Sequence, residues 1–236
     1  MQLMRPDVDR ICSEWQVYEP LLQLDGASIL ELGCGKAELT RHIATNGRDR
    51  RVLALEVDEA QHALNQRISD LPNVDFRLGG AEAIPVADGS MDIVLLFKSL
   101  HHVPVDLMPM ALEEIRRVLR PGGLVYVSEP VFAGAFNDIL QLFHNESRVR
   151  MAAFAALESA VASGRFELVE EIFFLAPQRF ADFDAFERGV IGVTHTRHHL
   201  TPEVHAEVKR RFATHQTPTG ALFHAPMRVD LLRRGA

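Results

Sequence analysis

The 236-residue chain has only two cysteines, one tryptophan and no long apolar run. Cys12 and Cys34 are too few for a disulfide framework and lack the paired spacing of a thiolate zinc site, so we expect two reduced thiols. No apolar stretch approaches the roughly 18 residues that span a bilayer, and residues 1–10 contain no hydrophobic signal segment. We therefore expect a cytoplasmic protein without a membrane partner.

Positive charge is also scarce, because 25 Lys and Arg stand against 32 Asp and Glu and give a formal net charge of −7. Such a chain has no general field that attracts phosphate backbones, so we do not expect a nucleic acid as partner. The most basic run, Lys209-Arg210-Arg211, is typical of a solvated helix face.

What the sequence does have is an alternation of short apolar runs and longer amphipathic stretches from Ser28 to Val127. This pattern predicts a parallel sheet covered by helices. The predicted strands are 29–32, 52–57, 74–78, 93–97 and 124–128, and the predicted helices are 36–44, 59–69 and 107–119, the last stopped by the Pro-Gly-Gly at 121–123. After Pro130 we expect a helical stretch over 132–164, strands over 168–175 and 222–232, and helices over 182–190 and 202–214.

The first strand runs into a glycine pair, Gly33 and Gly35, and then into a helix. In an open α/β sheet such a turn marks a ligand crevice, and residues without Cβ atoms let a ligand approach the backbone closely. A dinucleotide is the obvious competing ligand, but Glu38 stands where its fingerprint needs a third glycine, and Glu31 would repel a diphosphate. A cationic ligand would be attracted by Glu31.

A second carboxylate, Glu56, ends the second predicted strand, about 20 residues after the glycine pair. At this place a carboxylate can accept hydrogen bonds from both hydroxyls of a ribose. Glu56 therefore indicates a nucleoside ligand, without separating one nucleoside cofactor from another.

These segments resemble class I S-adenosylmethionine-dependent methyltransferases, of the small-molecule, methyltransferase-domain 11 or 25 type. ILELGCGKAELT is similar to the first motif of that family, LALEVD to the acidic motif of its second strand, and RVLRPGG to its turn before the fifth strand. Residues 73–103 also follow the family pattern. The resemblance implies a Rossmann-like, doubly wound α/β fold with helices on both faces. Its sheet has seven mostly parallel strands, and the antiparallel last strand lies between the fifth and the sixth.

The resemblance also implies a cofactor, S-adenosyl-L-methionine, and a product, S-adenosyl-L-homocysteine. Glu31, Gly33 and Gly35 would line the methionine portion, Glu56 would hold the ribose, and Ala81 and Glu82 would border the adenine, with Cys34, Val57 and Phe97 as further cofactor contacts. Phe97 would face the sulfonium through cation–π attraction, or it packs in the core. Gly80 departs from the usual aspartate, which removes a hydrogen-bond acceptor for the adenine amino group; we expect this to raise Kd about tenfold at most.

A methyl transfer of this kind needs the acceptor aligned in line with the S–CH3 bond, and a base only when the acceptor loses a proton. His101 is the candidate base because imidazole titrates near neutral pH, and His102 is the second candidate. The alternative is that this histidine pair only bonds the following helix. We expect no metal, and we interpret the histidine-rich segment 195–199 as a polar lid loop. Glu129 is expected to open toward the crevice.

We expect one domain over 1–236, with a helical cover at 1–25, a cofactor-binding core at 26–130, and a C-terminal part at 131–236 whose insert at about 178–218 covers the substrate. The expected partner is a small-molecule methyl acceptor, and a monomer and a homodimer both stay open. The alternative functions are a non-catalytic module that binds S-adenosylmethionine or another nucleoside, an RNA methyltransferase, and a dinucleotide-dependent oxidoreductase.

Overall fold

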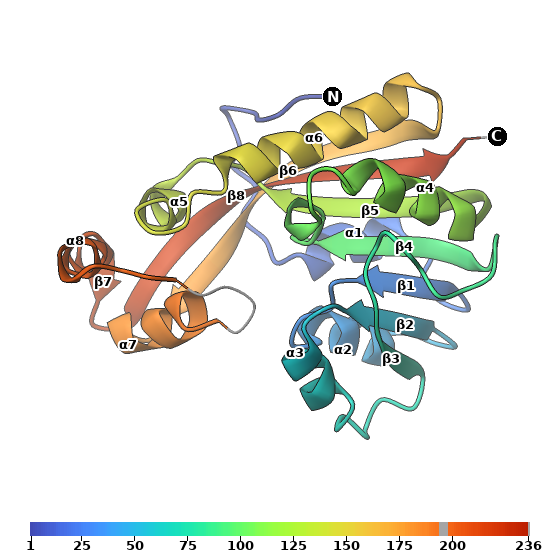
Figure 1. Ribbon diagram of the computed structural model, residues 1–236. Helices are drawn as coiled ribbons and strands as arrows, with labels where there is room; N and C mark the ends of the chain where they lie inside the picture. The colour runs from blue at the N-terminus through green and yellow to red at the C-terminus, as the bar shows by residue number, and fades with distance from the viewer. Residues whose placement is uncertain (194–197, 236) are drawn as a thin grey trace.

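A computed structural model describes residues 1–193 and 198–235, and its centre is one large sheet (Figure 1). The strand order is β3-β2-β1-β4-β5-β8-β6, and the short β7 pairs with β8 outside this path. Strands β1 to β5 run parallel, and β8 lies antiparallel between β5 and β6. The strands are β1 (Ser28–Leu32), β2 (Arg51–Glu56), β3 (Val74–Leu78), β4 (Met91–Phe97), β5 (Leu119–Pro130), β6 (Phe166–Phe180), β7 (Gln216–Thr217) and β8 (Gly220–Arg234).

Helices cover both faces of this sheet. The helices are α1 (Trp15–Leu21), α2 (Glu38–Thr45), α3 (Glu59–Asn65), η1 (Leu100–His102), α4 (Met108–Val118), α5 (Ala135–Leu140), α6 (Ser147–Ala162), α7 (Phe183–Phe186), η2 (Glu187–Ile191) and α8 (Pro202–Ala213). Among the described residues, no helix has both the length and the apolar character needed to cross a bilayer. The predicted doubly wound fold, with an antiparallel strand inserted between the fifth and sixth, is confirmed.

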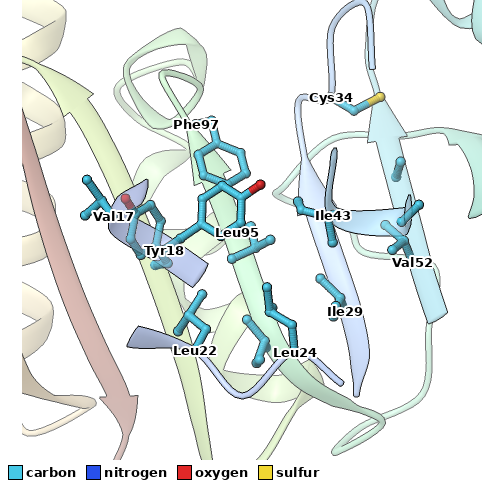
Figure 2. Packing of buried hydrophobic residues seen from close by; sticks show 14 of the residues in the cluster. Val17, Tyr18, Leu22, Leu24, Ile29, Cys34, Ile43, Val52, Leu95 and Phe97 are labelled. Carbon is cyan, nitrogen blue, oxygen red and sulfur yellow. The ribbon is translucent and has the colours of Figure 1, made fainter. Parts of the chain in front are cut away.

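Alternating side chains of the central strands point to opposite faces and form two cores. On one face Ile29, Val52 and Leu95 meet α1 and α2, as Figure 2 shows for this cluster. On the other face their chain neighbours pack under α4 and α6. Because both faces are covered, these strands carry apolar residues at most positions, which explains the nearly continuous apolar runs in the sequence.

Several element boundaries differ from the sequence-based expectation. The helix expected from residue 36 begins at Glu38, because Ala37 has a left-handed φ of 60° that no α-helix continues. The helical stretch expected over 132–164 is two helices, α5 and α6, separated by residues 141–146. Strands β6 and β8 extend well past their predicted ends, since they pair with each other from Phe166 opposite Arg234 to Phe180 opposite Ala221.

The far ends of β6 and β8 leave the main sheet and carry a separate apolar cluster. We use the name "arm" for α5 together with the described residues between 176 and 225. Figure 1 shows α5, α7, α8 and β7 gathered around the extended strands, away from β1 to β4. The arm has its own core, in which the fully buried members are Ile139, Phe186, Val208, Phe212, Ala221 and Phe223.

Candidate functional site

The glycine loop after β1 is held by backbone hydrogen bonds to the neighbouring strand. The N–H groups of Gly33 and Cys34 both donate to the carbonyl of Leu55, each at 2.9 Å. Gly33 has a φ of +74°, and a Cβ there would lie 2.8 Å from the Cβ of Ser99. Gly35 has a φ of +52°, but a Cβ there would meet nothing within 4 Å. Gly33 is thus required for packing inside the protein, whereas the space beside Gly35 is open to a ligand.

The carboxylate of Glu56 is buried and closes the same loop. One oxygen accepts from the N–H of Gly35 at 2.7 Å, and the other accepts from the N–H groups of Val57 and Asp58, both at 2.9 Å. A carboxylate offers about four acceptor positions, so these three bonds hold Glu56 in place and leave limited capacity for a ligand. The structure therefore joins Glu56 to the glycine loop that the sequence placed far from it along the chain.

Glu31 is the second acidic group beneath the loop, and only 2% of it is exposed. The hydroxyl of Thr40 donates to one carboxylate oxygen at 2.6 Å. The pKa of Glu31 is raised to about 7, chiefly by burial; the bond from Thr40 opposes this rise, and the charge of Glu56 contributes to it. A cation placed beside Glu31 would favour its ionised form, so this side chain suits a positively charged ligand group.

The residues predicted to border the adenine lie near the ends of β2 and β3. The side chain of Val57 is 65% exposed, while Ala81 is buried. A Cβ at Gly80 would collide with the carboxylate of Glu82, so that carboxylate occupies the space that a side chain at position 80 would fill. The structure thus provides a carboxylate near the position where the sequence lacks one.

Two further predicted cofactor contacts, Cys34 and Phe97, have buried side chains. Asn65 donates to the sulfur of Cys34 at 3.4 Å, and burial raises the pKa of this thiol, with the charges of Glu31 and Glu56 adding to the rise. Cys34 is a free thiol, like Cys12, but it is not a reactive thiolate. The ring centroid of Phe97 lies 5.4 Å from that of Tyr18, and Figure 2 shows both side chains. The ring centroid of Tyr126 lies 5.6 Å from that of Phe97.

His101 lies between two carboxylates and is 4% exposed. Its Nδ1 bonds the carboxylate of Glu129, and its Nε2 lies 3.6 Å from an oxygen of Glu146. Burial disfavours the charged imidazolium, but the two carboxylates outweigh this effect and raise the pKa of His101 to about 9. His101 therefore holds a proton at neutral pH, and it would have to release that proton before it acted as a base.

Glu129 does not open toward a crevice as expected, because it is 3% exposed and also accepts from the N–H of Leu100 at 2.9 Å. His102, by contrast, is exposed, and its ring centroid lies 4.1 Å from that of His101. Of the segment 195–199, residues 195–197 lie outside the described residues. His198 is described, and its ring centroid lies 4.7 Å from that of His144.

Sequence reasoning missed three polar residues that the fold brings to this region. Glu146 and His144 lie just before α6, and the Nε2 of His144 is 3.0 Å from the Oε1 of Glu146. Glu14 lies before α1, accepts from the hydroxyl of Tyr126 at 2.6 Å, and has its pKa raised by burial. No local motif marks these residues, since Glu14 and Glu146 reach Tyr126 and His101 from distant parts of the chain, and His144 joins this region only beside Glu146.

Comparisons with known proteins bear on this geometry. A family model described as a methyltransferase domain matches residues 29–123. A protein of Mycolicibacterium smegmatis, named a probable S-adenosylmethionine-dependent methyltransferase, is 32% identical over 182 residues, which cover 74% of this chain and 66% of that protein. A Mycobacterium ulcerans protein, named a probable phthiotriol/phenolphthiotriol dimycocerosates methyltransferase, is 36% identical over 100 residues, or 42% of this chain and 38% of that protein.

Among solved structures, that of a candidate methyltransferase from Bacillus halodurans matches with a TM-score of 0.65 and 17% identity, covering 94% of this chain and 99% of the other. That likeness shows the shared fold. Together with the matched domain and the relatives, it places the chain in the class I S-adenosylmethionine-dependent methyltransferase family. The matched part spans less than half the length of several curated relatives, 38% and 30% in two of them.

Proposed function

We propose that this protein transfers the methyl group of S-adenosyl-L-methionine to a small-molecule acceptor by direct in-line displacement. The single observation that supports this most is the loop from Glu31 to Gly35, in which an open glycine turn lies between two buried carboxylates, Glu31 and Glu56. That donor set fits the cofactor, because Glu31 suits the cationic methionine portion and Glu56 can accept from a ribose hydroxyl. The cofactor supplies an electrophilic methyl group on a sulfonium.

The adenine end is proposed to lie between the exposed side chain of Val57 and the backbone of Ala81. In this arrangement Glu82 takes over the role of the aspartate that Gly80 replaces, because its carboxylate already lies against Gly80. An ionised carboxylate there can accept from the adenine amino group. The expected loss of affinity from Gly80 is thus smaller than the sequence suggests.

The acceptor is proposed to approach from the side of η1 and β5, where His101 and His102 follow the end of β4. His101, charged and fixed by two carboxylates, would orient an acceptor through His102 or hold a proton near it. His102 is the more accessible of the two as a base, because it is exposed. The domain arrangement predicted from the sequence, with the insert at about 178–218 over the acceptor, belongs to the same proposal.

Calorimetric titration with S-adenosyl-L-methionine and with NADH tests the cofactor assignment. We expect heat from the first ligand only; binding of NADH alone would contradict the proposal. A second assay follows labelled methyl transfer into a metabolite extract, with formation of S-adenosyl-L-homocysteine as readout. Tight cofactor binding without transfer to any acceptor would favour a non-catalytic binding module instead.

A further inference from the structure

A cluster of imidazole and carboxylate groups lies between η1 and the start of α6, apart from the glycine loop. The ligand-type atoms of His101, His102 and Glu146 all lie within 4.8 Å of one another. The separation of 3.6 Å between the Nε2 of His101 and the Oε1 of Glu146 is long for a hydrogen bond. It is close to the separation of about 3.3 Å expected for two ligands bound tetrahedrally to one zinc ion.

Hydrogen bonds behind this cluster fix the direction of each donor. His101 uses its Nδ1 for the carboxylate of Glu129, which leaves Nε2 directed at Glu146. Glu129 is itself held by the N–H of Leu100 at 2.9 Å. A carboxylate on the far nitrogen of a histidine is the usual support for a metal-binding imidazole, because it fixes both the tautomer and the ring orientation.

Glu146 is oriented in the same way from its other side. Its Oε2 accepts from Arg150 at 2.5 Å and 3.1 Å, and Arg150 also donates to the side chain of Asn137 at 3.1 Å. The other oxygen, Oε1, is thereby left to face imidazoles, and His144 reaches it with Nε2 at 3.0 Å. This one carboxylate oxygen therefore lies near the imidazoles of His101 and His144, which come from two separate segments.

We propose that His101, His102 and Glu146 bind one divalent transition-metal ion of the zinc type, and that His144 lies beside this site. Binding of the ion displaces the proton that His101 otherwise carries on Nε2 toward Glu146, and this proton is released to solvent. Imidazole and carboxylate donors are suited to zinc and to its first-row neighbours. Three protein ligands leave a position for water or another small ligand, and the exposure of His102 gives the ion access from solvent. This proposal does not depend on methyl transfer, because it concerns binding of the ion alone.

The test is titration of chelator-treated protein with Zn²⁺ by calorimetry, and with Co²⁺ by visible absorption. We expect one equivalent to bind to the wild type, and the substitutions His102→Ala and Glu146→Gln each to weaken binding by about tenfold or more. The matched control is His205→Ala, which removes an imidazole that also bonds a glutamate, Glu187 at 2.6 Å, but lies in the arm. This control should bind Zn²⁺ like the wild type.

Thermal unfolding with and without Zn²⁺ guards against a misfolded variant. His102 is exposed, so His102→Ala is expected to melt near the wild-type temperature without the ion and to lose the rise in Tm that Zn²⁺ gives the wild type. Unchanged affinity in both cluster variants would overturn the ligand assignment. The site would also be overturned if the wild type bound Zn²⁺ only at millimolar concentration. The same conclusion would follow if His205→Ala weakened Zn²⁺ binding as much as the cluster variants do, and in both cases the cluster would be held only by its ion pairs.

Discussion

The cofactor-binding half and the arm are both built around buried apolar side chains, but they encode their structures differently. In the cofactor-binding half, valines, isoleucines and leucines fill most of each strand, and the candidate site residues lie at the strand ends or a few positions after them. In the arm, the core combines aromatic rings with a few aliphatic side chains, which come singly or in pairs from α5, β6, α7, α8 and β8. The structure of the cofactor-binding half can therefore be predicted from short sequence motifs, whereas that of the arm depends on contacts between segments that are distant along the chain.

The largest effect that would test this difference is expected from Phe212→Ala. Phe212 is fully buried in the arm and packs against the rings of Phe186 and Phe223, with centroids 5.2 and 5.8 Å away. Its truncation should cost about 3–5 kcal/mol of stability. Urea unfolding followed by circular dichroism measures this loss, and cofactor titration below the transition should give the wild-type affinity.

The control for that experiment is Arg210→Ala, an exposed change on the same helix that removes only a surface ion pair with Glu207. We expect it to change stability by less than about 1 kcal/mol. If Phe212→Ala also abolished cofactor binding, packing in the arm and cofactor binding would be coupled, and the contrast between the two regions would be wrong.

A second effect concerns the pH dependence of stability, and it compares a buried carboxylate of the cofactor-binding half with a partly exposed carboxylate of the arm. The pKa of Glu31 rises from 4.5 to about 7 on burial, so the folded state binds its proton more tightly than the unfolded chain. The stabilisation from this proton is complete below pH 4.5 and is lost as pH rises to about 7. Glu31→Gln has no carboxylate to ionise, so it should not show this decrease in the free energy of unfolding, which is at most about 3 kcal/mol. Without cofactor, the variant should therefore be more stable than the wild type at pH 8.

Stability curves at pH 5 and pH 8 measure this effect. Glu207→Gln serves as the comparison, because the bonds from Arg210 and Arg211 hold the pKa of Glu207 far below this pH range. That variant should keep the wild-type pH dependence between pH 5 and 8. A Glu31→Gln protein with the same pH dependence as the wild type would show that Glu31 is already ionised in the folded state.

A third, smaller effect is expected on cofactor affinity. Glu56→Ala should weaken S-adenosyl-L-methionine binding by about 1 kcal/mol or more, because it removes a charged acceptor and releases the N–H of Gly35. Calorimetry gives the change in Kd. Glu59→Ala, an exposed carboxylate nearby in α3, is the control for general charge effects and should leave Kd unchanged. Equal affinity in both variants would contradict the ribose assignment.

The smallest difference is expected between two glycines of the same loop. An alanine at Gly33 would press on Ser99, so Gly33→Ala should cost about 1 kcal/mol more stability than Gly35→Ala. Gly35→Ala meets open space in the free protein, and its effect should fall on cofactor affinity instead. Thermal melts and cofactor titrations of the two variants, made side by side, separate these outcomes; the reverse pattern would place the ligand against Gly33.

These contrasts explain how far the sequence predicted the molecule. The parallel strands follow a repeating pattern of apolar runs and amphipathic helices, which the sequence shows directly. The hydrogen bond between Gly35 and Glu56 joins two residues that the sequence had each marked as candidate cofactor contacts. The environment of His101 was not predictable in this way, because Glu129 and Glu146 reach it from 28 and 45 positions along the chain. The break between α5 and α6 was also missed, since both flanking segments have helix-forming composition.

The strand β8 has a consequence for how the protein is made. On the side of β5 that faces away from β4, residues Leu124 to Pro130 pair with the stretch from Arg233 back to Met227. While the ribosome is still adding the residues between Pro130 and Gly220, the apolar β5 has one side without its hydrogen-bonding neighbour. An unpaired strand of this kind can join a second nascent chain. Synthesis of this protein therefore includes an interval in which pairing between unfinished copies competes with the correct pairing of β5 with β8.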